Sequence, residues 1–220
     1  MPIPLTLGVP QRPDARPLTA QLLLPRVSSA DLASVPVHLL GTPVVPIAQL
    51  GAGDVGAVIG AFDLTGYDHD TELGLPTGVE LHLDCPPDLL TDVLTLPVRA
   101  TIFVAGRVDA EVVRTITSTG RRPGLDLSVP AEQVADFLSV LAHVDTGFVA
   151  RAATGAQALG GIAATVASLR GDDVRSAFAK PNIEALNRLN AEAAAAVREV
   201  LIGIEVTDPV GVARELAVLS

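Results

Sequence analysis

A short segment of the sequence alternates ionisable and apolar side chains, as a strand with two different faces does. Residues 79–85 read VELHLDC. Successive side chains of a strand point to opposite faces, so Glu80, His82 and Asp84 share one face and the leucines share the other. Burying the three ionisable groups unpaired would cost several kcal/mol. We therefore expect them to contact partners, water, a metal ion or a ligand.

Other segments predicted as strands also carry polar residues on one face or directly after their ends. In most of these segments the opposite face is apolar, as expected for residues packed beneath helices. The full set is His38, Asp63, Glu80, His82, Asp84, Arg107, Asp126, Arg151 and Glu205. A purely structural barrel would fill such places with Val, Ile and Leu. We therefore interpret the set as the lining of a functional site.

Two alternatives stay open at this point. Interior ion pairs, such as Arg151 with Asp126 or Glu205, could serve the structure alone. A strand register shifted by one residue would also turn every one of these side chains to the opposite face.

The residue types suggest a role for each member of the set. His82 is the predicted general acid or base, because an imidazole changes its charge near neutral pH. Arg151 is expected to hold a carboxylate or phosphate of a substrate, since its guanidinium forms paired hydrogen bonds with such groups. The predicted catalytic residues are His82, Asp84, Asp63 and Glu205. The predicted substrate-binding residues are His38, Glu80, Arg107, Asp126 and Arg151.

His82 and Asp84 are also the candidate metal ligands. An imidazole together with carboxylates suits Zn²⁺, Mn²⁺ or Fe²⁺, so the cofactor could be a divalent metal ion. The loop TGYDHDTELG at residues 65–74 gathers further Asp, His and Glu side chains. It could act as a lid, as a metal-binding loop or simply as a solvated polar loop.

The elements that position these residues form an alternating pattern. Short β-branched or Leu-rich runs alternate with longer helical segments, which is typical of βα units and a parallel sheet. The predicted strands are residues 3–9, 37–41, 58–64, 79–84, 100–105, 124–129, 147–152 and 202–207, with 20–24 as a ninth candidate. We predict a single α/β domain over residues 1–220, most simply a (βα)₈ TIM-type barrel. Prolines make its N-terminal portion irregular, and an open α/β sandwich is the alternative.

Helix signals follow most of the predicted strands. Asp109 is a predicted N-cap, Pro130 is predicted to occupy the first position of a helix, and Asp208 with Pro209 opens the last helix. The predicted helices are residues 88–94, 110–117, 131–143, 155–169, 182–200 and 209–218, the fifth being the longest. Residues 171–180 are predicted to be an inserted loop. The small residues of 155–169 and the alanines of 191–197 could form a subunit seam, which leaves a homo-oligomer open.

Composition narrows the class of protein. Of the 220 residues, 49% are hydrophobic and only 3% aromatic, so a large aliphatic core can form. The formal charge of −10 argues against a nucleic-acid partner, which needs a basic face. The single cysteine fits a reducing compartment, and neither a signal peptide nor an apolar run of membrane-spanning length is evident. We expect a cytoplasmic protein whose partner is a small molecule, with neither nucleic acid nor membrane involved.

These observations predict an enzyme that acts on a small polar or anionic metabolite at the C-terminal face of a barrel. A lyase or aldolase, an isomerase and a metal-assisted hydrolase are all compatible with inward-facing acids, His and Arg. Lys180 is the only lysine and lies far from any predicted strand end, so Schiff-base chemistry is not expected. The rival interpretation is a non-catalytic barrel-like subunit or small-ligand-binding protein.

Overall fold

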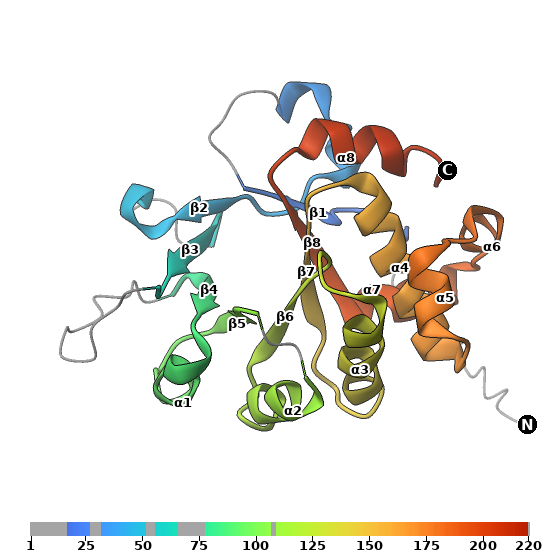
Figure 1. Ribbon diagram of the computed structural model, residues 1–220. Helices are drawn as coiled ribbons and strands as arrows, with labels where there is room; N and C mark the ends of the chain where they lie inside the picture. The colour runs from blue at the N-terminus through green and yellow to red at the C-terminus, as the bar shows by residue number, and fades with distance from the viewer. Residues whose placement is uncertain (1–16, 27–31, 52–55, 66–77, 107–108, 220) are drawn as a thin grey trace, which may run out of the picture.

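The computed structural model describes residues 17–26, 32–51, 56–65, 78–106 and 109–219. Eight parallel strands form a nearly closed barrel (Figure 1). They are β1 (Leu23–Pro25), β2 (Val44–Pro46), β3 (Ile59–Asp63), β4 (Glu80–Cys85), β5 (Ala100–Val104), β6 (Arg122–Asp126), β7 (Phe148–Ala152) and β8 (Leu201–Val206). The hydrogen-bonded order is β1-β8-β7-β6-β5-β4-β3-β2. Isolated parallel bridges from Leu23 to Leu40 and from Arg26 to Val44 bring β1 beside the β2 segment. This closure confirms the TIM-type α/β barrel rather than an open sandwich.

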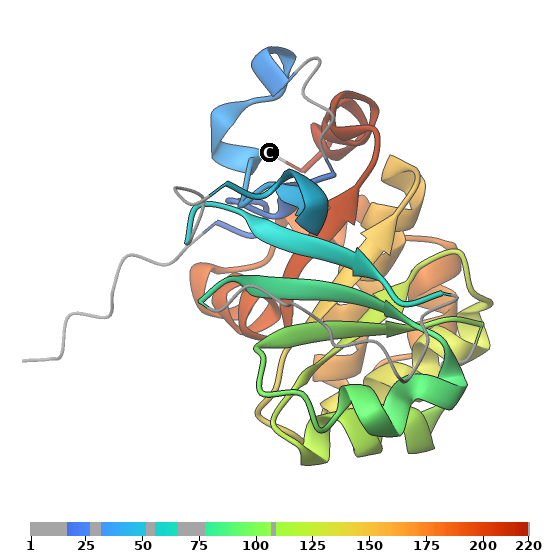
Figure 2. The same cartoon turned by 90° about the vertical axis from the view of Figure 1, so that its left-hand side faces the viewer.

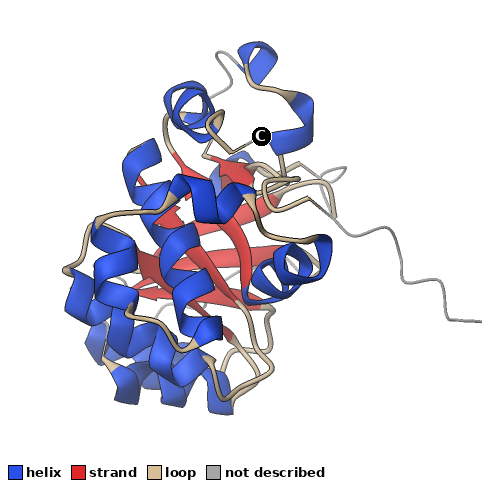
Figure 3. Cartoon of the chain, turned by 90° about the vertical axis from the view of Figure 1, so that its right-hand side faces the viewer, coloured by secondary structure: helices blue, strands red, loops and turns tan. Residues whose placement is uncertain are grey.

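Helices surround the barrel on much of its circumference. They are α1 (Leu90–Val93), α2 (Ala110–Ser118), α3 (Ala131–Leu141), α4 (Gly155–Arg170), α5 (Val174–Ala179), α6 (Ile183–Asn187), α7 (Ala191–Val200) and α8 (Pro209–Leu216). Short 3₁₀ helices lie at Leu32–Ser34, Val37–Leu39, Ile47–Gln49 and Pro87–Leu89. Helices cover the strands on the side shown in Figure 3, whereas β3 and β4 face the viewer in Figure 2. None of the described helices has both the length and the apolar character needed to cross a bilayer.

The predicted alternation along β4 is present in the structure. Leu81, Leu83 and Cys85 are fully buried and pack with Leu89 and Val93 in the layer between strands and helices. Glu80, His82 and Asp84 therefore lie on the face toward the barrel interior. The interior also contains a small apolar cluster, made of Leu24, Val44, Ile59, Ala61, Phe103 and Val149.

Two glycines make room for large side chains inside the barrel. A Cβ atom on Gly124 of β6 would overlap the ring of Phe103 on β5, and one on Gly203 of β8 would lie 2.6 Å from Leu24 Cδ1 on β1. Each large residue thus fills the space that a glycine leaves on the adjacent strand, which keeps the interior packed.

The N-terminal portion differs from the sequence prediction. The strand expected at residues 37–41 is wrong, because Val37–Leu39 form a 3₁₀ helix after Pro36 and the second strand begins at Val44. Proline has a fixed φ and no backbone N–H, and this segment contains several prolines, so its strands are short. The first strand comes from the ninth candidate, and residues 3–9 lie outside the described residues.

The helix predicted over residues 182–200 is also wrong as a single element. It divides into α6 and α7, because the side chain of Asn190 accepts a hydrogen bond from Ala193 N at 2.8 Å and starts a new helix. The loop predicted at 171–180 contains α5, which Asp173 caps. The longest helix is α4, whose Gly160 and Gly161 lie against Phe178 and Leu127 of the same chain.

Candidate functional site

A buried carboxylate, Glu205 on β8, is the centre of a charged cluster inside the barrel. Its side chain has no solvent-exposed surface, and three basic side chains from other parts of the barrel contact its two oxygens. His82 Nδ1 lies 2.8 Å from its Oε2, Arg26 Nε lies 2.9 Å from its Oε1, and Arg151 Nε lies 3.2 Å from the same oxygen. Residues of β4 and β7, and the residue after β1, thus meet at one carboxyl group.

The same two arginines also hold Asp84, the next inward-facing residue of β4. Arg151 Nη1 donates to Asp84 Oδ1 at 2.7 Å, and Arg26 Nη2 donates to Asp84 Oδ2 at 3.2 Å. Both guanidiniums therefore lie between two carboxylates, and the four charges balance. The exposed fractions of these side chains, 26% for Asp84, 20% for Arg151 and 32% for Arg26, leave this part of the cluster accessible to solvent.

The electrostatic surroundings keep Glu205 ionised. Burial acts to raise its pKa, but the hydrogen bond from His82 and the charges of Arg151 and Arg26 outweigh burial and hold the pKa below its ordinary value. The pKa of Arg151 is raised for the corresponding reason: burial acts to lower it, and Glu205 and Asp84 more than compensate. Both groups therefore carry their charges at neutral pH.

The ionised Glu205 fixes the orientation of His82. A carboxylate only accepts hydrogen bonds, so His82 Nδ1 carries the hydrogen in their contact. The second ring nitrogen, Nε2, is buried and has no hydrogen-bond partner among the described residues. The Oγ1 of Thr101, the residue paired with His82 on β5, is in the same situation.

Phe103 packs against the cluster from β5. Its ring lies 4.1 Å from Arg151 Cζ, which is a cation–π geometry, and its centroid lies 5.7 Å from that of His82 in an edge-to-face arrangement. Since Gly124 leaves the space that this ring occupies, β6 contributes to the site without a side chain.

The cluster lies toward the carboxyl ends of the strands. Asp84, Arg151 and Glu205 are each the penultimate residue of their strands, and Arg26 directly follows β1. This is the end at which TIM barrels place their active sites. His82 is two residues deeper and only 1% exposed, so it supports the cluster from within the barrel.

Two other predicted residues hold turns at this end. The Asp63 carboxylate accepts a hydrogen bond from Thr65 N at 2.8 Å, and its hydrogen bonds to Thr65 lower its pKa. The Asp126 carboxylate accepts one from Ser128 N at 2.8 Å. Both carboxylates thus stabilise the chain reversal after a strand.

The remaining predicted residues lie elsewhere. His38 is exposed on the 3₁₀ helix Val37–Leu39, and Glu80 lies at the opposite end of the barrel in an ion pair with Arg122. Arg107 and residues 66–77, which hold most of the acidic loop, lie outside the described residues.

Sequence reasoning missed Arg26, which belongs to the centre of the cluster. The available signal was its position two residues after the end of the ninth strand candidate, since Arg107 was chosen at the same distance from the end of the strand predicted at 100–105. Had residues 20–24 been treated as the first barrel strand, Arg26 would have entered the predicted set.

The described residues do not support the metal ligands predicted from the sequence. Asp84 is held by two guanidiniums and His82 Nδ1 by Glu205. Within the described ranges there is no group of three or more His, Cys, Asp or Glu side chains placed to hold a metal ion.

Comparison with known proteins identified no relative of this chain. No family model matches the sequence, and neither a curated protein nor a solved structure matches it. A barrel of this type is compatible with an enzyme, but the fold itself does not specify a reaction.

Proposed function

We propose that this chain is an enzyme that binds a small anionic metabolite at the C-terminal end of the barrel and transfers a proton on it, as isomerases and lyases do. One observation carries the proposal. Arg26, Asp84 and Arg151 come from three separate strands and converge in a partly exposed cluster at the barrel end where such enzymes react.

The two guanidiniums provide the binding chemistry. Arg26 and Arg151 each use a terminal Nη group on Asp84, at 3.2 and 2.7 Å. A substrate carboxylate or phosphate offers the same paired acceptor oxygens, so it can replace Asp84 as the partner of these Nη groups. Glu205 keeps its contacts with both arginines from beneath, which preserves their positions during the exchange.

When the substrate anion displaces Asp84 from the two arginines, the Asp84 carboxylate stays beside the bound anion and can act as a general base. Asp84 would take a proton from the carbon next to the substrate's carbonyl or carboxylate group, and the electron pair would move onto the substrate oxygen as an enolate. The arginines stabilise the developing negative charge. In isomerisation Asp84 returns the proton to the former carbonyl carbon, while the proton of the adjacent hydroxyl group passes to the enolate oxygen and that hydroxyl becomes the new carbonyl. In a lyase reaction the enolate electron pair forms a carbon–carbon double bond, and the group on the next carbon leaves with its bonding electrons and takes the proton from Asp84.

In this proposal His82 acts through Glu205 rather than on the substrate. Its side chain is 1% exposed and its Nδ1 hydrogen bond fixes one oxygen of Glu205. His82 is therefore a positioning residue, and the acid–base role passes to the more exposed Asp84.

A specific observation also favours the rival function, a non-catalytic subunit or binding protein. Two guanidiniums and two carboxylates satisfy one another, so the cluster is complete as a structural core without any ligand. The two functions differ in what happens when an anion is added.

The experiment measures hydrogen–deuterium exchange at carbon by NMR for a panel of small carboxylates and phosphorylated hydroxy- and keto-acids in D₂O. Wild type should catalyse exchange of at least one member, and Asp84→Asn should slow it by about a hundredfold or more, as loss of a general base does. Asp84→Asn should still bind that anion, and its unfolding transition shows that it is folded.

Glu184→Gln is the matched control, because Glu184 lies on α6 and forms an exposed ion pair with Arg188. It should leave exchange unchanged. If wild type neither exchanges nor binds any anion of the panel, the proposal is wrong and the structural role stands; binding without exchange would favour the binding protein.

A further inference from the structure

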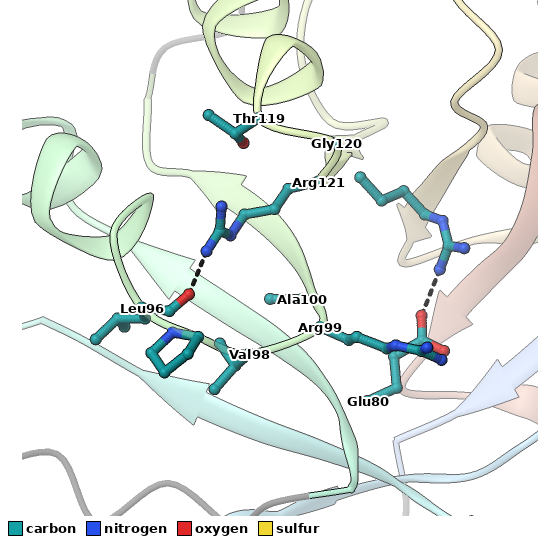
Figure 4. Close-up of a pocket in the computed structure, with 10 residues that line it drawn as sticks. Glu80, Leu96, Val98, Arg99, Ala100, Thr119, Gly120 and Arg121 are labelled. Carbon is teal, nitrogen blue, oxygen red and sulfur yellow. Dashed lines mark hydrogen bonds and ion pairs between the residues drawn. The ribbon is translucent and has the colours of Figure 1, made fainter.

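A second group of charged residues lies at the opposite end of the barrel, where the strands begin. Three cavities of about 580, 440 and 450 Å³ adjoin there, and Glu80 at the start of β4 lines all three. Figure 4 shows the largest, between the loops that precede β5 and β6.

The charge at this end is opposite to that of the chain as a whole. The sequence has 25 acidic and 15 basic residues. The described residues that line the three cavities include a single acidic side chain, that of Glu80. They include four arginines, Arg99, Arg121, Arg122 and Arg198. A local excess of guanidinium groups in an acidic protein attracts anions.

The arginines differ in how far the protein itself occupies them. Arg198 donates to the Leu201 carbonyl and to that of Ile202 at 2.8 Å, which holds the start of β8. Arg121 donates to the Leu96 carbonyl, a contact marked by a dashed line in Figure 4. These two guanidiniums have structural tasks.

Arg99 and Arg122 are the groups with capacity for a ligand. Arg99 is exposed and forms neither a hydrogen bond nor an ion pair through its side chain with the described residues, and it lies beside Glu80 because Leu81 N donates to its carbonyl at 3.0 Å. Arg122 pairs with Glu80 through one Nη, while its Nε is buried without a partner among the described residues.

An independent observation comes from His82, which forms part of the wall of the 440 Å³ cavity. The His82 side chain is only 1% exposed to solvent, and its Nε2 has no hydrogen-bond partner among the described residues. A buried polar atom without a partner costs free energy, so it favours a ligand that supplies a hydrogen bond. Arg122 also lines this cavity, whereas Arg99 lines the two cavities that adjoin it. An oxyanion beside Arg122 with a hydroxyl group toward His82 would therefore satisfy both side chains, and Arg99 would contact the oxyanion from the adjoining cavity.

We propose that the N-terminal end of the barrel binds a small hydroxylated oxyanion, with Arg99 and Arg122 holding its phosphate or carboxylate group. This site lies at the other end of the barrel from Arg26 and Arg151 and does not depend on the function proposed for them. Glu80 competes with the ligand for Arg122, so it limits the affinity.

The test is calorimetric titration of the full chain at low ionic strength, with glycerol 3-phosphate in one arm and malate in the other, which separates a phosphate from a carboxylate ligand. Arg99→Gln should weaken the binding of the preferred probe by about tenfold. Glu80→Gln should strengthen it, because the competing carboxylate is removed.

Arg114→Gln is the matched control, since Arg114 is exposed on α2 and lines none of the three cavities. It should leave the affinity unchanged. The ¹⁵N signal of His82 Nε2 should shift on addition of the probe to wild type. Equal affinities for Arg99→Gln and Arg114→Gln, an unshifted His82 signal, or no binding in either arm would overturn the proposal.

Discussion

His82 Nδ1 and Glu205 Oε2 lie 2.8 Å apart although their strands face each other across the barrel. In the hydrogen-bonded order, β4 and β8 are four strands apart in one direction, and four apart through the β1–β2 bridges in the other. This hydrogen bond therefore connects opposite walls, and Arg26 and Arg151 extend the connection to the strands on either side of β8.

Removing the charge of Glu205 should destabilise the protein strongly. Glu205→Gln keeps an acceptor for His82 but leaves two partly buried guanidiniums without one of their carboxylates. We expect the free energy of unfolding to fall by about 3–5 kcal/mol, the usual cost of breaking a buried ion pair. Urea denaturation at neutral pH measures it. The exposed Glu184→Gln should change the free energy of unfolding by less than about 0.5 kcal/mol. Similar losses in the two variants would show that the buried ion pairs of Glu205 do not stabilise the protein.

The same carboxylate should make stability depend on pH in the acid range. The folded-state pKa of Glu205 lies below its ordinary value of 4.5, so the unfolded chain binds more protons in between. The stabilisation is therefore complete above the ordinary value and is lost as the pH falls toward the folded value. Between about pH 6 and pH 3, wild type should lose more unfolding free energy than Glu205→Gln does. Parallel pH profiles of the two proteins would exclude this role.

Residues 79–85 show what the sequence could predict. A period of two over seven residues defines the faces of a strand, and the structure places Leu81 and Leu83 under helices and His82 inside. The partner of His82 could not be derived in the same way. Which residue of β8 faces it across the barrel depends on the tilt and stagger of eight strands, and these are set by packing of the whole chain.

The errors have equally specific causes. An Ala-rich segment favours one continuous helix, but the side chain of Asn190 begins a new one at Ala191. Arg26 was missed because β1 has only three residues and ends in a proline, so its strand signal is weak.

A methyl group added inside the barrel should disturb the site through packing alone. In Gly124→Ala the new Cβ would overlap the ring of Phe103, which in turn contacts Arg151 at 4.1 Å. We expect a loss of about 1–3 kcal/mol in unfolding free energy, as for other overpacked cores. The double variant Gly124→Ala with Phe103→Leu should recover part of it, because the smaller side chain makes room. Additive losses in this double-mutant cycle would show that the two residues do not compete for space.

The thiol of Cys85 should react very slowly with thiol reagents in the folded protein. Its side chain is fully buried among the residues beneath α1, with Sγ 3.2 Å from the Pro86 carbonyl. Burial, with a smaller contribution from Asp88, raises the pKa of its thiol to about 11, so very little reactive thiolate exists near neutral pH. Since Cys85 is the only cysteine in the sequence, labelling with a thiol reagent reports on this one group. The native protein should react at least about a hundredfold more slowly than the urea-unfolded chain at about pH 8. Similar rates in the two states would mean that β4 opens readily, and the inward placement of His82 and Asp84 on the same strand would then lose its support.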